Sequence, residues 1–160
     1  MPFARIDRAI AVCQAHLDAV SNADPDKPEL ENYLVSGLLI LMVSQYEGLI
    51  RRLFGDRAAL CGDADVCQYV RGLLDREFRS PNLNKITEHL AKLGDSYRQA
   101  FSGQVLNTDE HLAWDNVITA RHTVVHVTGI ASITFSELSQ DFYPKTRQVI
   151  AALTAALGLP

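Results

Sequence analysis

An unbroken helical pattern runs from Pro28 to about Leu60, and this stretch of roughly thirty residues is the longest element that the chain can form. Proline is well suited to the first position of a helix. The run Leu38–Val43 is the most apolar in the chain, but polar residues such as Ser36 and Ser44 bound it. It is therefore well short of the ~20 apolar residues that a membrane span needs. We expect this helix to be the buried centre of a helix bundle.

Helices are predicted along nearly the whole chain, from an apolar period of 3.6 residues or from capping residues. Besides the long helix, they are expected over 4–20, 64–78, 82–93 and 95–101 (capped by Asp95). Two more are expected, from Thr108 or Asp109 to the segment before Gly129, and from Ser136–Glu137 to 157, with a kink or a restart at Pro144. Loops are expected at Ser102–Gln104 and, in preference to a short unpaired strand, at Ile130–Thr134. The sequence predicts one all-α domain, 1–160, folded as a helix bundle.

The composition of the chain limits how it could bind nucleic acid. With 160 residues it can bury about 70% of its unfolded surface in a single core. The net charge of −4 argues against strong non-specific binding to nucleic acid, so any RNA contact must be local. Arginines outnumber lysines, and five of them could form such a patch, although each taken singly fits a solvated helix face. They are Arg51, Arg52, Arg71, Arg76 and Arg79.

The cysteines and the N-terminus indicate a cytoplasmic protein. Cys13, Cys61 and Cys67 are an odd number, so one must stay unpaired, and Cys61 and Cys67 are too far apart for a CxxC redox or zinc pattern. A reducing compartment is the simplest inference. The first residues lead into a charged amphipathic stretch and not into an apolar signal core. We expect a cytoplasmic protein without a membrane segment.

Residues 121–126 concentrate the groups that can do chemistry. Arg121 supplies a permanent cation with a planar fork suited to phosphate, and His126 supplies a proton donor or acceptor near neutral pH. His122 lies beside the arginine. An arginine and a histidine provide part of the set of groups needed to cleave RNA without a metal.

The spacing of these residues sets a geometric problem. At about 100° per residue, Arg121 and His126 point roughly 140° away from each other on one helix, whereas His122 and His126 share a face. A local unwinding near Gly129 could bring the arginine and the second histidine together. A second copy of the helix, packed against the first, could do so as well.

The motif resembles the signature of the HEPN superfamily of ribonucleases. That signature is an arginine, a polar residue, three more positions and a histidine near the end of a helix in a small all-helical domain. His122 fits the polar second position. The resemblance covers about four-fifths of the chain and is nearest to the branch called RiboL-PSP or MAE-28990-like. Its long second helix is similar to Tyr33–Leu53, with Ser44-Gln45-Tyr46-Glu47 inside it. Its closing helix is similar to Ile133–Leu138 followed by Val149–Leu153.

The resemblance implies a homodimer in which two motif helices form a composite, metal-independent endoribonuclease site without a cofactor. On this hypothesis one His126 serves as base, its symmetry mate as acid, and the two copies of Arg121 stabilise charge. Trp114, Ile118 and Val125 would bury part of the contact, unless they belong to the core. Family members commonly act as toxins or in phage defence, with an antitoxin or defence partner. The alternative is a non-catalytic HEPN-like module that binds RNA, a nucleotide or a partner protein.

Other interpretations of the same residues remain open at this stage. An arginine and a histidine on a helix are often structural. His122 and His126 could chelate zinc, but no further ligand at suitable spacing completes the set. Glu47 on the long helix is either a hydrogen-bonded structural acid or a group that orients His126 or Arg121. No Gly-rich phosphate loop, HExxH or GxSxG motif is present, so nucleotide hydrolysis and serine hydrolysis have no support.

Overall fold

The structure is a computed structural model that describes residues 2–78, 81–127 and 129–159. Within these ranges it contains helices and no strand, which confirms the predicted all-α bundle. The elements are α1 (Ala4–Ala19), α2 (Lys27–Ala59), α3 (Ala64–Glu77), α4 (Leu83–Leu93), α5 (Asp95–Val105), α6 (Asp109–His126), the π-helical segment η1 (Glu137–Phe142) and α7 (Tyr143–Ala156). Most of their ends lie within a residue or two of the predicted ones.

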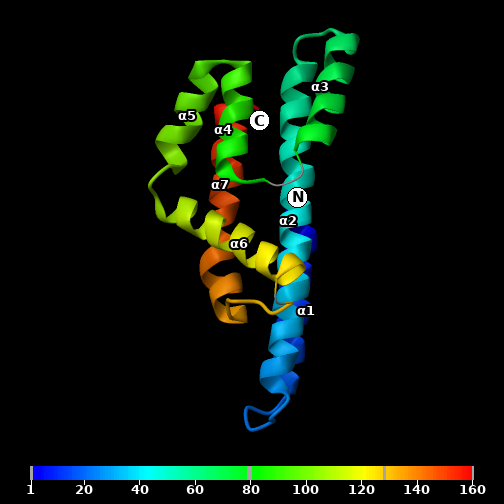
Figure 1. Ribbon diagram of the computed structural model, residues 1–160, viewed down its shortest axis with the longest axis vertical. Helices are drawn as coiled ribbons and strands as arrows, with labels where there is room; N and C mark the ends of the chain where they lie inside the picture. Colours follow the sequence, from blue (N-terminus) through cyan, green and yellow to red (C-terminus); the bar gives the residue numbers. More distant parts are fainter. Residues whose placement is uncertain (1, 79–80, 128, 160) are drawn as a thin grey trace.

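Helix α2 is the spine of the molecule (Figure 1). Helix α1 packs along its N-terminal half and α3 along its C-terminal half. Helices α4 and α5 form a hairpin, and α5 also packs against α7. Helix α6 contacts both α7 and α2 and crosses between them, so the helix that carries the arginine and histidine motif bridges the two halves of the bundle.

The buried residues of helix α2 recur at intervals of three and four positions and so form one broad face toward the other helices. Leu39, Met42, Tyr46 and Ile50 are completely shielded from solvent, whereas Ile40 in the apolar run is 44% exposed. The expectation that this helix is too little apolar for a membrane span is wrong by length and composition alone, because a window of it has a mean hydropathy of 1.5 and is long enough to cross. Half of that window is buried inside the protein, as in the core helix of a soluble bundle.

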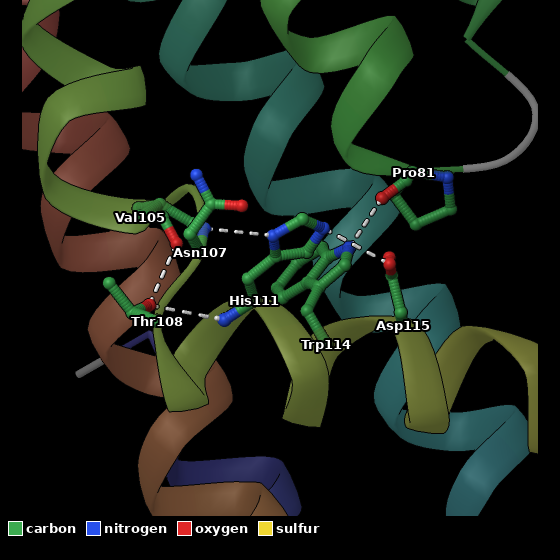
Figure 2. Close-up of polar contacts among 7 residues, drawn as sticks. All are labelled: Pro81, Val105, Asn107, Thr108, His111, Trp114 and Asp115. Carbon is green, nitrogen blue, oxygen red and sulfur yellow. Dashed lines mark hydrogen bonds and ion pairs between the residues drawn. The ribbon is translucent and has the colours of Figure 1, made fainter.

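The start of α6 is held by the polar contacts that Figure 2 shows. The Thr108 side chain caps the helix by accepting a hydrogen bond from the backbone N–H of His111 (3.4 Å), and its hydroxyl donates to the Val105 carbonyl (2.7 Å). The His111 ring accepts a hydrogen bond from the Asn107 backbone at Nδ1 (3.2 Å) and lies 3.2 Å from the Asp115 carboxylate through Nε2. The predicted cap at Thr108 is confirmed.

Trp114 anchors α6 in the core. It is completely buried, and its indole N–H donates to the Pro81 carbonyl (2.7 Å; Figure 2). Its ring stacks on Tyr46 of α2, with centroids 5.0 Å apart and planes inclined by 24°. The Tyr46 hydroxyl is hydrogen-bonded to Thr146 of α7 (2.7 Å). One aromatic pair therefore connects α6 with α2, α7 and the segment before α4, and Trp114 is a core residue that cannot also bury a dimer contact.

Helix α5 differs from the prediction at both ends. Ser102–Gln104, predicted as a loop, is helical, because Phe101 and Val105 lie one turn apart and are both buried. Packing of these two side chains outweighs the low helix propensity of the intervening glycine. Asp95 does not cap the helix. It is the first helical residue, after Gly94, and its carboxylate pairs with Arg98 at 3.0 Å.

The last helical region begins earlier than expected. Thr134 and Glu137 form a reciprocal capping box: the Glu137 carboxylate accepts from the Thr134 backbone N–H (2.8 Å), and the Thr134 hydroxyl accepts from the Glu137 backbone N–H (3.2 Å). Ser136, the predicted start, already has helical geometry and makes no capping bond. Pro144 occupies the first turn of α7, so the predicted restart at this proline is confirmed.

We predict that Trp114→Ala lowers the free energy of unfolding by about 3–5 kcal/mol, because it opens a cavity and removes the stack on Tyr46. Leu112→Ala is the matched control on the same helix. Leu112 is 63% exposed, so this change should alter stability by no more than about 0.5 kcal/mol. Urea unfolding followed by circular dichroism measures both. Equal losses would contradict the anchoring role of Trp114.

Candidate functional site

Helix α6 keeps regular geometry through the Arg121–His126 motif. The helix ends at His126, and the backbone N–H of Val127 donates to the Thr123 carbonyl (3.0 Å). The Thr123 hydroxyl donates to the Thr119 carbonyl (3.1 Å), which accommodates this β-branched residue in the helix. The chain leaves the helix only after the second histidine. Local unwinding therefore does not bring Arg121 and His126 together within one chain.

The three motif side chains lie in different surroundings. Arg121 is half-buried on the side of α6 that faces α2, whereas His122 and His126 are exposed. The two imidazole rings lie 4.9 Å apart between centroids, with planes inclined by 48°. The predicted shared face of His122 and His126 and the divergence of Arg121 from His126 are both confirmed.

A hollow of about 230 Å³ lies where α6 crosses α2. It is lined by Val43 of α2 and by Ile118, Thr119, Arg121 and His122 of α6. The structure thus places Arg121 and His122 on one hollow, and His126 is the ring neighbour of His122. Ile118 belongs to the wall of this hollow, and Val125 is 43% exposed farther along the helix.

Glu47 and Arg121 bring opposite charges together between the two helices. Glu47 lies one turn after Val43 on α2. Its Oε1 atom and the Nε atom of Arg121 are both buried, and neither has a hydrogen-bond partner among the described residues. Burial raises the pKa of the Glu47 carboxyl, and the cations of Arg121, Arg51 and Lys85 oppose this shift in that order.

Burying these two atoms without hydrogen-bond partners lowers the stability of the fold, which a purely structural role would not explain. A buried polar atom without a partner costs about 1–3 kcal/mol, and most such atoms in proteins are satisfied. The Glu47 Oε1 atom does not fit the hydrogen-bonded structural acid that the sequence also allowed. A carboxylate with a perturbed pKa, near an arginine whose buried Nε has no partner and near a hollow, is typical of a functional site. Among the described residues, the cations that act on Glu47 are Arg121, Arg51 and Lys85, and no histidine is one of them.

The predicted arginine patch is only partly assembled. Arg51, Arg52 and Arg71 line one hollow between α2 and α3. Arg76 lies farther along α3, where its Nε donates to the Gly72 carbonyl, and it does not line that hollow. Arg79 lies outside the described residues.

No group of three or more histidines, cysteines, aspartates or glutamates able to hold a metal occurs in residues 2–78, 81–127 and 129–159. His111, the nearest histidine in sequence to the motif pair, is occupied by Asn107 and Asp115 (Figure 2). Cys13, Cys61 and Cys67 are free thiols. Two histidines of one chain supply only half of a tetrahedral zinc site.

Lys85 is the site residue that sequence reasoning missed. It lies at the start of α4 and acts on the Glu47 carboxyl, yet no motif or spacing in the sequence connects it with α2. Only the packing of the helices brings it near. No protein-family model, curated protein or solved structure matches this chain, so the chemistry of the site is argued from its own residues.

We predict that Glu47→Gln stabilises the protein at neutral pH. Burial raises the folded-state pKa of Glu47 above its ordinary value of 4.5, so the folded protein binds more protons than the unfolded chain between the two values, and stability falls as pH rises through that window. Glutamine cannot ionise. The variant and the wild type should therefore have the same melting temperature below pH 4.5 and diverge above it.

Thermal unfolding across acidic and neutral pH tests this prediction. Glu88→Gln removes an exposed carboxylate of α4 and serves as the matched control, with no comparable divergence expected. A Glu47→Gln variant that is less stable than the wild type at neutral pH would show that the pair with Arg121 is a net stabilising salt bridge.

Proposed function

We propose that this chain is a HEPN-like, metal-independent endoribonuclease whose active site is shared between two copies. The observation that carries the proposal is that Glu47 Oε1 and Arg121 Nε are both buried without a hydrogen-bond partner among the described residues, while Arg121 lines a hollow that His122 also lines. An arginine at the edge of a cavity, beside an imidazole, suits an anionic ligand that undergoes proton transfer.

The reaction follows from what these groups can exchange. A base removes the proton of a ribose 2′-OH, whose oxygen then bonds to the adjacent phosphorus. The bond from phosphorus to the 5′-oxygen breaks, and an acid gives that oxygen a proton. The products are a 2′,3′-cyclic phosphate and a 5′-hydroxyl. Imidazoles can serve as base and acid, and the arginine stabilises the charge of the phosphorane.

A second copy of the chain supplies the groups that one copy cannot align. Arg121 and His126 diverge on a regular helix, so one His126 acts as base and its symmetry mate as acid. The exposed side of α6 carries His122, Val125 and His126 together, and an isologous two-fold contact would place two such faces opposite each other. Val125 and Val127, which are 43% and 69% exposed, supply apolar area for this contact.

Glu47 and His122 have supporting roles in this proposal. Glu47 is a positioning residue that holds the Arg121 guanidinium at the edge of the hollow through its charge. His122 lies beside the His126 ring and restricts its orientation. The stability cost of the Glu47–Arg121 pair is then the cost of a preorganised anion site.

The proposed setting is a cytoplasmic toxin or phage-defence component that an antitoxin or sensor protein holds in check. A nuclease directed at cellular RNA must be restrained by such a partner. The competing function is a non-catalytic HEPN-like module that binds RNA, a nucleotide or a protein. Cleavage of RNA by the pure protein separates the two.

We predict that His126→Ala and Arg121→Ala each lower the rate of RNA cleavage about 100-fold or more while helical content is unchanged, because they remove proton transfer and charge stabilisation. Arg121→Lys keeps the charge beside Glu47 and should still lose most of the activity, because lysine lacks the planar fork. His16→Ala, at an exposed histidine of α1, is the control and should be fully active. Full activity of either motif variant to alanine would overturn the catalytic assignment.

The composite site predicts rescue between subunits. Each variant homodimer lacks both copies of one group, whereas the heterodimers formed by mixing Arg121→Ala and His126→Ala subunits keep one Arg121 and one His126. Cleavage should therefore recover only in small part, because one of the two proton-transfer groups is still missing. Light scattering measures the prerequisite, which is a dimer at micromolar concentration. A strict monomer that cleaves RNA would contradict the shared site.

Chelators should leave the rate of RNA cleavage unchanged, because acid, base and charge stabilisation are all assigned to side chains. Cleavage is measured with and without a strong chelator, and zinc content is measured by elemental analysis. Stoichiometric zinc that is absent from His122→Ala, together with chelator-sensitive activity, would assign the histidine pair to a metal instead.

A further inference from the structure

A second hollow, of about 290 Å³, lies between α2 and α3, away from the motif helix. Its lining residues are Arg51, Arg52, Gly55 and Asp56 of α2 and Arg71, Leu74 and Asp75 of α3. The residues of each helix recur at intervals of three or four positions and so share a face. Three guanidinium groups from two helices therefore converge on one recess.

The recess has an apolar floor. Leu74 is 3% exposed. Arg71 lies across Gly55, since a Cβ atom at that glycine would be 3.6 Å from Arg71 Nε and 3.7 Å from its Cγ. Glycine inside a helix costs about 0.5–1 kcal/mol relative to alanine, and here its missing side chain leaves the surface of α2 open beside the arginine.

The recess carries three arginines against two aspartates, Asp56 and Asp75, so positive charge is in excess by one. Arg51 pairs with Asp75 at 3.5 Å, and the Asp75 side chain is 71% exposed. Arg52 and Arg71 form no ion pair among the residues that the structure describes. Exposed ion pairs contribute little to stability, so an incoming anion can displace Asp75 from Arg51 at small cost.

The recess and the candidate active site both lie on α2, and Arg51 lies on the side of the recess nearer to Glu47 in the chain. The Arg51 Nε donates to the backbone carbonyl of Glu47 (3.4 Å), and its guanidinium reaches Asp75 in the recess. Val43 in the first hollow and Arg51 in the second are two turns apart on α2, a separation of about 12 Å at 1.5 Å per residue. Arg52 also lines a third hollow, of about 420 Å³, together with Arg5.

We propose that the arginine recess of α2 and α3 binds backbone phosphates of the RNA strand that flank the scissile bond. This inference rests on the proposed nuclease function. Arginine forks match the phosphate oxygens, and a strand lying along α2 would run from the Arg121 hollow over Arg51 to Arg52 and Arg71. The recess gives an acidic protein the local cationic surface that strand binding needs.

Binding is measured apart from cleavage with a fluorescently labelled 2′-O-methyl oligoribonucleotide, which lacks the attacking hydroxyl. We expect the double variant Arg52→Ala with Arg71→Ala to bind about 10-fold more weakly in an anisotropy titration. The slope of log binding constant against log salt concentration should become shallower by about 0.7 for each lost phosphate contact. Arg76→Ala removes one of the arginines of α3 outside the recess and is the control, compared per charge removed, with wild-type affinity expected at moderate salt.

Asp75→Asn should have the opposite effect on the affinity of the recess for the oligonucleotide. Removal of the carboxylate that competes for Arg51 should tighten oligonucleotide binding several-fold. Glu77→Gln removes a carboxylate of the same helix that pairs with Lys92 outside the recess, and it should have no such effect. These side chains are exposed, so circular dichroism should show the fold unchanged in each variant.

These experiments test the recess proposal separately from the proposed nuclease activity. Equal weakening by the double variant and by Arg76→Ala, or no weakening, overturns the recess proposal even if RNA is cleaved. Binding that depends on Arg71 in a protein that cleaves nothing supports the recess and rejects the nuclease. If inorganic phosphate binds at the recess but the double variant binds the oligonucleotide as the wild type does, the recess is a site for a free anion, and the RNA proposal is overturned.

Discussion

The stacking of Trp114 on Tyr46 is the interaction on which the position of the motif helix depends. Both rings are completely buried, and each uses its polar atom to reach a further element, Trp114 to Pro81 and Tyr46 to Thr146. Aromatic rings bury large apolar areas in a specific geometry, so this pair holds the crossing of α6 over α2 more tightly than aliphatic contacts alone would.

The position of the charged pair follows from that crossing. Arg121 lies seven residues after Trp114, which is two helical turns, so both project from the same side of α6 toward α2. Glu47 is the neighbour of Tyr46 in the chain. The aromatic anchor thus brings Arg121 and Glu47 into one partly buried space, where solvent is scarce and electrostatic forces are strong. Glu47 Oε1 and Arg121 Nε cost stability because they are buried in this packed region without a hydrogen-bond partner among the described residues.

Helix boundaries were largely predictable because caps and periodicity act locally. Thr108 caps α6 as expected, and Pro144 lies in the first turn of α7. The errors occurred where distant packing outweighs local preference: Gly103 stays helical because Phe101 and Val105 are both buried, and Thr134 rather than Ser136 forms the cap before η1. The sequence alone could not separate core from interface for Trp114, since a buried aromatic residue fits either.

The amino-acid sequence by itself determined the all-α architecture and the relation of the motif residues to one another. Helical periodicity is enough to place His122 and His126 on one face and Arg121 on another, because it depends only on neighbours in the chain. Tertiary structure decided that the charges of Arg121 and Lys85 act on Glu47, and that Arg51, Arg52 and Arg71 share a recess which Arg76 does not line. These contacts join different helices. Their geometry is set by how large side chains interlock, which no short stretch of sequence encodes.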